Sequence, residues 1–314
     1  MKVEENREII NGYTLLEPLK NKNAGFSRWT YASKDGAEWF LKEFLDPVFP
    51  MDGRIGEKQL EVRRKAGLDF EKKRKELYAA VNASSDGNVV RVRDFFRHGA
   101  RYYITMDKVA GEAFDIPGLM NLPVGVRMQL CRVIAHSVAC LHAKRIVHSD
   151  IKDRNILIKK TVMQTYTAKL IDFDCSFLEE CPPQSESELG GDQIYLSPEA
   201  CLFLCGEETK LTTKMDVFSL GILFHQYLTG YVPWYDSSEF DYLHEAVLEG
   251  NRAGVSERVP AEWRPVLEKM LLADPEERCT MEEVCRKIIP GYRNIDENIN
   301  AGYGFNFAEN IGGL

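Results

Sequence analysis

The spacing of apolar residues along the chain changes about a third of the way in. Before that point, short apolar runs with strand-like composition predominate, at residues 13–16, 28–32, 39–44, 89–96 and 102–106. Turn residues at Lys34-Asp35-Gly36 separate two of these runs. A single long helical pattern, residues 58–81, interrupts them. The first part of the chain is therefore predicted to be a small sheet that carries one main helix.

From Leu122 onward the apolar residues recur at helical spacing, at residues 124–144, 213–229, 238–249, 261–272 and 280–288. Short strand-like runs at 156–158 and 169–171 interrupt these helices. Val109-Ala110-Gly111 is the candidate connector between the two parts. The longest apolar run, 217–228, is too short to span a bilayer and predicts a buried core helix.

Residues 291–314 are rich in Asn and Gly and carry scattered aromatic residues. Two interpretations of this tail stay open. It is either a mobile terminus, or its aromatic side chains dock on the domain and cover a groove.

Composition limits the classes of function. The 314 residues are 44% apolar and 28% charged, which is an ordinary globular balance, and the net charge of −8 disfavours a general nucleic-acid binder. The eight cysteines have no zinc-site spacing and are too sparse for a disulfide scaffold, so we expect reduced thiols in a cytoplasmic protein. The first ten residues lack an apolar signal segment, and we expect no association with a membrane.

The stretch from His148 to Asn155, followed seventeen residues later by Asp172-Phe173-Asp174, carries the chemistry. Transfer of a phosphoryl group to a hydroxyl needs a carboxylate for the proton, a cation on the γ-phosphate and oxygen ligands for magnesium. Asp150 can supply the first and Lys152 the second. Asn155 and Asp172 can supply the third. Each residue is commonplace alone, but the set at this spacing is highly specific.

These motifs resemble those of the protein kinase family over about residues 13–290. The family's catalytic loop, His-Arg-Asp-x-Lys-x-x-Asn, is kept except for its arginine. Ser197-Pro198-Glu199 resembles the end of the activation segment, and the run from Asp216 to Gly221 resembles the start of the central buried helix. Arg278 resembles the arginine that pairs with the segment's glutamate, so the resemblance implies a buried Glu199–Arg278 ion pair.

The resemblance implies a bilobal α+β fold, with a small N-terminal lobe (residues 1–108), a larger helical lobe (109–290) and the tail (291–314). It implies a serine/threonine protein kinase that uses ATP and Mg²⁺, with ATP between the lobes. Lys152, two positions after Asp150, is typical of serine/threonine rather than tyrosine kinases. Asp192, which stands where such kinases usually have threonine, weakens that assignment. The expected partners are a protein substrate and a regulatory protein.

The resemblance also assigns residues to the site. Asp150, Lys152, Lys42 and Glu71 would be catalytic, and Asn155 and Asp172 would hold the metal. Met106 would be the gatekeeper, and the backbone of Asp107 and Val109 would bind adenine. The expected nucleotide contacts as a set are Lys42, Gly25, Ser27, Trp29, Phe40, Met106, Asp107, Val109, Glu112 and Leu157.

Four departures from the family pattern bear on activity. Lys22, Ala24 and Ser27 fill the three positions of the glycine-rich loop, which predicts weaker phosphate binding. Trp29 and Phe40 replace a valine and an alanine over the adenine, where they either stack on the base or fill its pocket. Asp174 replaces a glycine. Ser149 replaces the arginine that grips a phosphorylated activation loop, so we expect no dependence on phosphorylation of Ser185 or Ser187.

The glutamate that should pair with Lys42 is ambiguous. Arg74 lies at the centre of the predicted buried face of the long helix, with Glu71 at its edge and Glu76 on the far side. Glu71 is favoured. The alternative is that both glutamates form ion pairs on a solvated face, for example Glu71 with Lys75.

Two other classes of protein compete with the kinase assignment. A pseudokinase scaffold is favoured by the altered glycine loop and the aromatic residues over the adenine. A small-molecule kinase shares the catalytic loop, but Ser197-Pro198-Glu199 and Arg278 resemble the apparatus that holds a peptide. Retention of the five residues Lys42, Asp150, Lys152, Asn155 and Asp172 favours catalysis.

Overall fold

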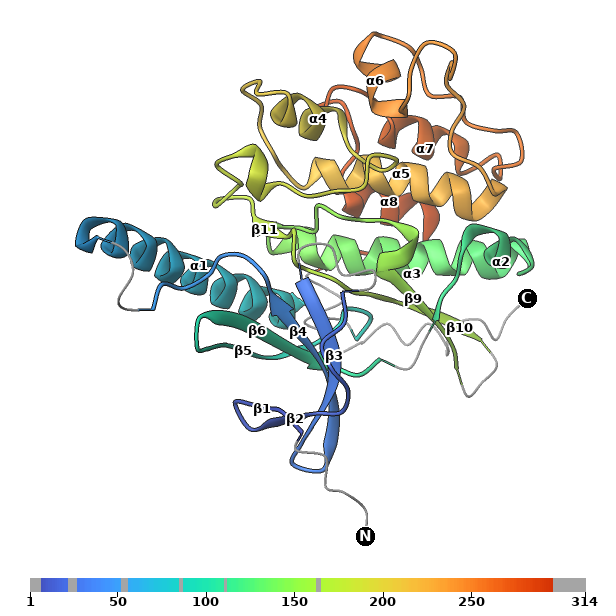
Figure 1. The fold of residues 1–314 in the computed structure, drawn as a ribbon. Coiled ribbons are helices and arrows are strands. Elements are labelled where there is room, and N and C mark those ends of the chain that lie inside the picture. The colour runs from blue at the N-terminus through green and yellow to red at the C-terminus, as the bar shows by residue number, and fades with distance from the viewer. Residues whose placement is uncertain are drawn as a thin grey trace. The chain divides into compact units, whose positions relative to one another are not determined.

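The computed structural model describes residues 7–21, 27–51, 56–84, 87–109, 112–161 and 165–295. The chain divides into two compact units, the first made of residues 1–83 and 90–110, the second of 84–89 and 111–314. Both are drawn in Figure 1. Residues 84–89 join the second unit because Val89 forms a β-bridge with Leu170, whose N–H donates to Asn88 O at 2.8 Å.

The first unit contains a six-stranded antiparallel sheet in the order β1-β2-β3-β4-β6-β5. The strands are β1 (Ile9–Ile10), β2 (Tyr13–Leu15), β3 (Ser27–Lys34), β4 (Ala37–Phe44), β5 (Val92–His98) and β6 (Arg101–Asp107). Asp35 and Gly36 join β3 to β4 with φ values of 53° and 76°. Two consecutive left-handed residues define the type I′ turn whose twist suits a hairpin.

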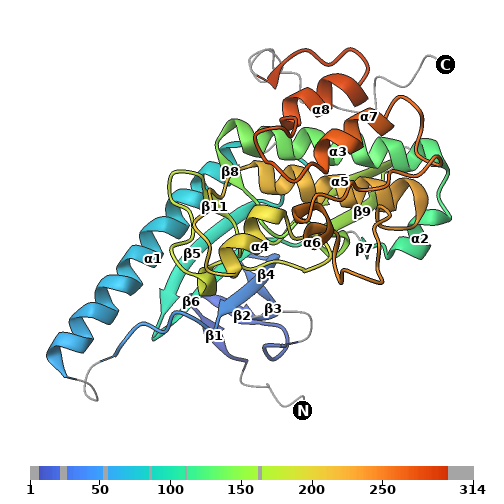
Figure 2. The same cartoon turned by 90° about the horizontal axis from the view of Figure 1, so that it is seen from above.

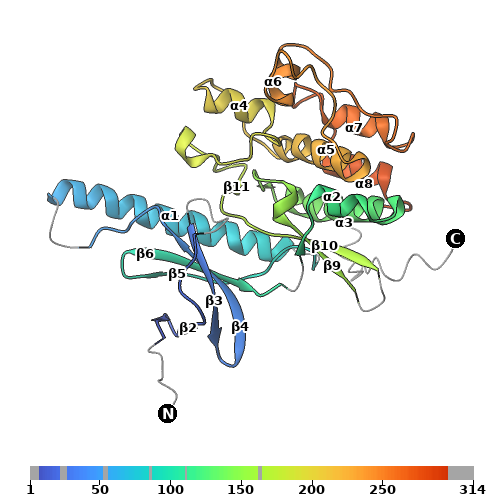
Figure 3. The same ribbon diagram turned by 45° about the vertical axis from the view of Figure 1, so that its right-hand side comes forward.

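Helix α1 (Glu57–Ser84) packs on this sheet through aromatic side chains. Phe70 contacts the rings of Phe44, Phe95 and Tyr102, and Tyr78 also contacts Phe95. Close packing begins at Gly67, where a Cβ would lie 2.7 Å from the Phe49 ring. The preceding turns project beyond the strands, as Figures 1 to 3 show, and almost all of their residues are exposed.

The second unit is mostly helical. Its helices are α2 (Ile116–Met120), α3 (Val124–Ala143), α4 (Pro198–Leu204), α5 (Lys214–Thr229), α6 (Leu243–Leu248), α7 (Arg264–Met270) and α8 (Met281–Ile288). Its short strands are β7 (Glu112–Ala113), β8 (Ile146–Val147), β9 (Ile156–Lys160), β10 (Tyr166–Leu170) and β11 (Phe177–Leu178). The 3₁₀ turns η1 (Asp153–Asn155) and η2 (Glu186–Glu188) complete the set. The strands form two small sheets, β10-β9-β7 and β11-β8.

Helices α3 and α5 form the core of this unit, and α8 packs on α3 (Figure 2). Every residue of α5 from Met215 to Thr229 is buried, which confirms the predicted core helix. By length and composition α3 could also cross a membrane, but 67% of its most apolar window is buried inside the protein. Such burial is typical of a core helix of a globular protein.

Two expectations need revision. The helix predicted from residue 238 begins only at Leu243, because Asp236 accepts hydrogen bonds from the N–H and hydroxyl of Ser238 in a turn. The tail begins as packed structure, since Ile295 is buried and the Tyr292 ring lies 6.1 Å from that of His136. The aromatic residues of 296–314 lie outside the described residues.

Candidate active site

The carboxylate of Asp150 is held in place by the two side chains that follow it in the catalytic loop. Lys152 Nζ lies 2.9 Å from Oδ1 and 2.8 Å from Oδ2 of Asp150. Asn155 Nδ2 donates to Asp150 Oδ2 at 2.9 Å and to its backbone oxygen at 2.7 Å. The Asp150 side chain remains 11% exposed. A carboxylate fixed in this way can accept a proton from a hydroxyl group that reaches it.

Asp216, at the start of α5, fixes the backbone of the same loop. Its buried carboxylate accepts from the N–H groups of His148 (2.8 Å) and Ser149 (2.9 Å), and it lies 3.0 Å from His142 Nε2. Ser149 has φ = 70°, a left-handed conformation that is strained for a residue with a side chain. The two hydrogen bonds to Asp216 stabilise it. Asp216 was part of a recognised motif, but its role in positioning the loop was not predicted from the sequence.

The two expected metal ligands lie on adjacent segments of the second unit. Ile171 N–H donates to Asn155 O at 3.0 Å, which places Asp172 beside the segment that carries Asn155. His148 Nε2 contacts Ile171 O at 3.0 Å, and its ring lies 4.9 Å from that of Phe173. Asp172 has φ = 65°, so the backbone turns sharply at the carboxylate. Asp174 is half-buried in the turn that follows.

This donor set fits magnesium. Both hydrogen bonds of the Asn155 side chain use Nδ2, so that among the described residues its Oδ1 is left for a cation. One amide oxygen and one carboxylate match the preference of Mg²⁺ for a few protein oxygens, with phosphate and water in the other positions. The part of the chain that the structure describes has no group of three or more His, Cys, Asp or Glu residues suited to a metal. A magnesium site of the kinase type does not require one.

Glu199 and Arg278 form the buried ion pair that the sequence predicted. Arg278 donates from Nη1 and Nη2 to the two carboxylate oxygens of Glu199, each at 2.8 Å, and both side chains are at most 2% exposed. The remaining guanidinium N–H groups bind the backbone oxygens of Leu272, Ala273 and Lys214. The pair ties α4 to the start of α5 and to the segment before α8.

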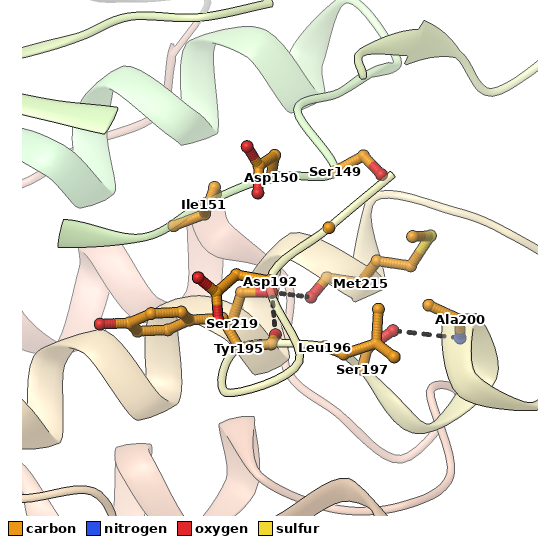
Figure 4. Close-up of a pocket in the computed structure, with 11 residues that line it drawn as sticks. Ser149, Asp150, Ile151, Asp192, Tyr195, Leu196, Ser197, Ala200, Met215 and Ser219 are labelled. Atoms are coloured by element: carbon orange, nitrogen blue, oxygen red, sulfur yellow. Dashed lines mark hydrogen bonds between the residues drawn. The ribbon is translucent and has the colours of Figure 1, made fainter. Parts of the chain in front are cut away.

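A small pocket lies beside Asp150 within the second unit. Figure 4 shows Ser149, Asp150 and Ile151 on one side of it and the segment from Asp192 to Ala200 on the other. Tyr195 is fixed there by hydrogen bonds, since its hydroxyl donates to Gln226 Oε1 at 2.7 Å and its backbone oxygen accepts from Ser219 Oγ. Asp192 Oδ1 accepts from Ile194 N–H at 3.1 Å. A residue presented to Asp150 would therefore meet the carboxylate of Asp192.

Glu179 anchors the start of the segment between Asp172 and Glu199. Its Oε1 accepts from both the N–H and the hydroxyl of Thr213, at 2.8 and 2.9 Å, and its Oε2 pairs with Arg145 at 3.2 Å. Its own N–H donates to Arg145 O. A glutamate here supplies a fixed negative charge, as a phosphate group would. The anchoring role of Glu179 was not predicted from the sequence.

In the first unit, Lys42 occupies the predicted place on a central strand. It pairs with Trp29 on β3 and Ile104 on β6 and is only 6% exposed. Met106 is buried near the end of β6, and the Asp107 N–H donates to Arg91 O at 3.2 Å. That hydrogen bond engages the Asp107 N–H and does not involve the Asp107 carbonyl oxygen.

The structure does not bring Glu71 to Lys42, contrary to the favoured prediction. Glu71 forms ion pairs with Arg97 at 3.3 Å and with Lys75 at 3.7 Å, and Glu76 lies 4.0 Å from Lys72. The solvated-face alternative is the one observed. The reason is the rotation of α1, which its aromatic residues set and which points Glu71 toward β5.

Arg74 lies at the centre of the buried face, as the helical wheel predicted. Its guanidinium lies 5.4 Å from the Phe70 ring and 5.8 Å from that of Phe44. A half-buried position of α1 that contacts the sheet thus carries a cation.

The two aromatic residues predicted over the adenine stack on each other. The Trp29 and Phe40 ring centroids are 5.4 Å apart with an interplanar angle of 22°, and Tyr31 meets both edge-on. Lys20 lies over Trp29 and Lys108 over Tyr31. The result is a half-buried aromatic surface on β3 and β4 of the first unit.

The other expected nucleotide contacts are distributed over both units. Ser27 is buried at the start of β3, and Val109 is half-buried just after β6. Glu112 in β7 pairs with Ile158, and Leu157 in β9 pairs with Ala113. Gly25, together with Lys22 and Ala24, lies outside the described residues.

Comparison with known proteins agrees with this site. A family model described as the protein kinase domain matches residues 54–288, which include the catalytic loop and Arg278 but not Lys42. Serine/threonine-protein kinase PkaA of Streptomyces coelicolor is 29% identical over 233 residues, which are 72% of this chain and 41% of PkaA.

Two eukaryotic proteins are also similar. Serine/threonine-protein kinase SBK1 of Danio rerio is 30% identical over 58% of this chain and 49% of its own length. Aurora kinase of Schizosaccharomyces pombe is 24% identical over 90% of this chain and 85% of its own. Several relatives, PkaA and SBK1 among them, are thus matched over less than half of their length. With most of its length matched by the family model, the chain belongs to the protein kinase family.

Proposed function

We propose that this protein is a serine/threonine protein kinase that transfers the γ-phosphoryl group of ATP to a protein hydroxyl with the help of Mg²⁺. The observation that carries the proposal is the arrangement around Asp150, whose carboxylate is held by Lys152 and Asn155 next to the segment with Asp172. A protein without catalytic activity has no chemical need for this set. The relatives named as serine/threonine kinases support the same assignment.

In the proposed reaction, Asp150 accepts the proton of the substrate hydroxyl while the hydroxyl oxygen forms a bond to the γ-phosphorus of ATP. The bond between the γ-phosphorus and the bridging oxygen breaks, and ADP leaves. Lys152 lies on both carboxylate oxygens of Asp150, so it orients this base and brings positive charge to the transferred group. Asn155 Oδ1 and Asp172 would hold Mg²⁺, which neutralises phosphate charge when bound. Lys42 would bind the nucleotide phosphates.

The acceptor is proposed to be a protein and not a small molecule. The Glu199–Arg278 pair and the Tyr195–Gln226 hydrogen bond stabilise an ordered surface beside Asp150. A small-molecule acceptor does not require such a surface, whereas an extended peptide does.

A pseudokinase is the second candidate, and specific observations favour it. Trp29 and Phe40 form a stacked pair where the family has small aliphatic residues, and Glu71 pairs with Arg97 and not with Lys42. These features predict weak nucleotide binding, but they do not alter the catalytic loop.

The deciding test measures transfer of labelled phosphate from ATP, with and without Mg²⁺, followed by mass spectrometry of the products. Asp150→Asn should lower the rate by about 10²- to 10⁴-fold, the range for loss of a general base. Asp153→Asn is the matched control, because Asp153 lies in the same loop and only caps the N–H of Arg154. Equal rates for Asp150→Asn and wild type, or no turnover at all, would overturn the proposal.

We also propose that the protein is cytoplasmic. All eight cysteines are free, which suits the reducing cytoplasm, and the net charge of −8 disfavours nucleic acid as a partner. We expect a protein substrate and a regulatory protein as partners, and no attachment to a membrane.

A further inference from the structure

A groove in the second unit lies apart from the residues assigned to catalysis. Its volume is about 370 Å³, within the range of ligand sites. Pro182 and Pro183 form one wall, and Phe203 of α4 and Leu211 form the apolar floor. Pro182 O accepts a hydrogen bond from Gln184 Nε2 at 2.9 Å, which helps to fix that wall.

The floor is a continuation of the hydrophobic core. Leu211 belongs to the buried cluster that contains Val147 and Phe177, and Phe203 packs against the same cluster while remaining half-buried. An apolar side chain that entered the groove would therefore extend a core that already exists. Burial of one such side chain removes apolar surface from water, which favours binding.

A helix-terminating motif shapes the other wall. Glu207 N–H donates to Leu202 O at 2.9 Å and Gly206 N–H to Phe203 O at 3.0 Å, which is the Schellman pattern. Gly206 has φ = 82°, so the chain reverses there and brings residues 208–211 back along the groove. Because this wall is hydrogen-bonded backbone, the groove is pre-formed.

The groove itself is lined by one anionic residue, Glu208, and one cationic residue, Lys210, but negative charge predominates on the two segments that form it. Five exposed glutamates lie on the two segments that form it, namely Glu180, Glu186, Glu188, Glu207 and Glu208. Lys210 is the one cationic residue between positions 180 and 211. The segments meet at Gly206, where a Cβ would lie 3.6 Å from Glu186 Oε1. Phosphate-rich partners would be repelled, and a basic segment attracted.

We propose that this groove docks a segment of the protein substrate in which one bulky apolar side chain is flanked by lysines or arginines. The apolar side chain fills the space over Phe203 and Leu211, and the flanking cations pair with the glutamate rim. Docking here holds the substrate while its hydroxyl group is presented to Asp150, so it raises the effective concentration of the acceptor. The proposal rests on the kinase function proposed above.

Charge also argues against the tail of this chain as the occupant. The tail of this chain, residues 296–314, carries Asp296, Glu297 and Glu309 and no lysine or arginine. A segment of that charge would be repelled by the rim. A second copy of the chain could present the basic part of α1, and self-association is therefore one outcome of the test.

The test uses fluorescence anisotropy of a fluorescein-labelled peptide, Arg-Lys-Leu-Phe-Lys-Arg, titrated with the full chain. The same peptide with two asparagines in place of Leu-Phe measures the apolar anchor. Glu207→Lys/Glu208→Lys reverses the rim, and Thr209→Trp fills the groove without changing its charge. Glu257→Lys/Glu268→Lys is the control, because it makes the same change of charge at exposed positions elsewhere in the unit.

The proposal expects saturable binding that weakens at least tenfold in the rim variant, in Thr209→Trp and with the asparagine peptide, and that is unchanged in the control. If Glu207→Lys/Glu208→Lys and Glu257→Lys/Glu268→Lys weaken binding equally, the peptide responds to the overall surface charge and not to the groove, and the proposal is overturned. Concentration-dependent dimers that Thr209→Trp abolishes would also overturn it, in favour of a self-interface. Because the peptide has no hydroxyl group, its binding is measured independently of phosphoryl transfer. If the peptide binds as expected but the protein transfers no phosphate from ATP to any protein acceptor, the proposed kinase activity is refuted and the groove remains a docking site.

Discussion

The Glu199–Arg278 pair allows a quantitative prediction for Arg278→Met. The guanidinium has five N–H donors, and all five are used, two on Glu199 and three on backbone oxygens. The substitution leaves the Glu199 carboxylate, 2% exposed, without its partner. Removal of one partner from a buried ion pair costs about 3–5 kcal/mol, out of a total stability of about 5–15 kcal/mol.

The assay is urea denaturation followed by tryptophan fluorescence, since Trp263 is buried within the second unit. Arg278→Met should lower the urea midpoint strongly at an unchanged slope. Glu199→Leu/Arg278→Met removes the stranded charge, so it should be less destabilised than the sum of its two single variants, by about 2–3 kcal/mol.

Arg286→Met is the contrast. Arg286 pairs with Glu282 one turn away on α8, and both side chains are exposed, so its loss should cost less than about 1 kcal/mol. Similar costs for Arg278→Met and Arg286→Met would refute the reasoning, as would a double variant whose loss equals the sum of the single losses.

Three further outcomes follow from the observed contacts. Glu71→Gln should change the phosphoryl-transfer rate less than threefold, because Glu71 pairs with Arg97, whereas Lys42→Met should lower the rate more than tenfold. Equal losses of rate in a steady-state assay would contradict this. Glu179→Gln should lower the rate about tenfold, while alanine at Ser185 and Ser187 leaves it unchanged. The opposite order in that assay would show that phosphorylation, and not Glu179, anchors the segment. Burial lowers the pKa of His225, so the unfolded chain binds the proton more readily than the folded chain does. The stability that neutral His225 contributes is therefore fully present only above the ordinary histidine pKa of about 6.5. The urea midpoint should therefore decrease when the pH is lowered from 7.5 to 5.5, and it should decrease by less in His225→Gln. An equal decrease in both proteins would exclude this histidine as the cause.

Local sequence was sufficient where the chemistry depends on residues close together in the chain. Asp150, Lys152 and Asn155 lie within six residues, so a short loop with a 3₁₀ turn brings their side chains together. The buried helix α5 and the hairpin at Asp35-Gly36 were likewise predictable, because apolar runs and turn residues report directly on burial and backbone conformation.

Sequence was insufficient where the answer depends on packing between distant segments. Glu71 and Arg74 are three residues apart on α1, and the helical period alone leaves the exact rotation of the helix open. Contacts of Phe70 and Tyr78 with the sheet set that rotation and turn Glu71 toward Arg97. The roles of Asp216 and Glu179 were missed for a similar reason, since their partners lie 68 and 34 residues away.

The sequence by itself determined the kinase motifs and the two-part organisation, because these follow from residue type and spacing, and the resemblance of the motifs to the kinase family implied the partner of Arg278. Only the tertiary structure decided which charged side chains meet on α1, how the Trp29 and Phe40 rings stack, and that two segments of the second unit enclose a groove. The physical reason is that side-chain contacts across a fold depend on relative rotation and packing, for which a linear pattern carries little information.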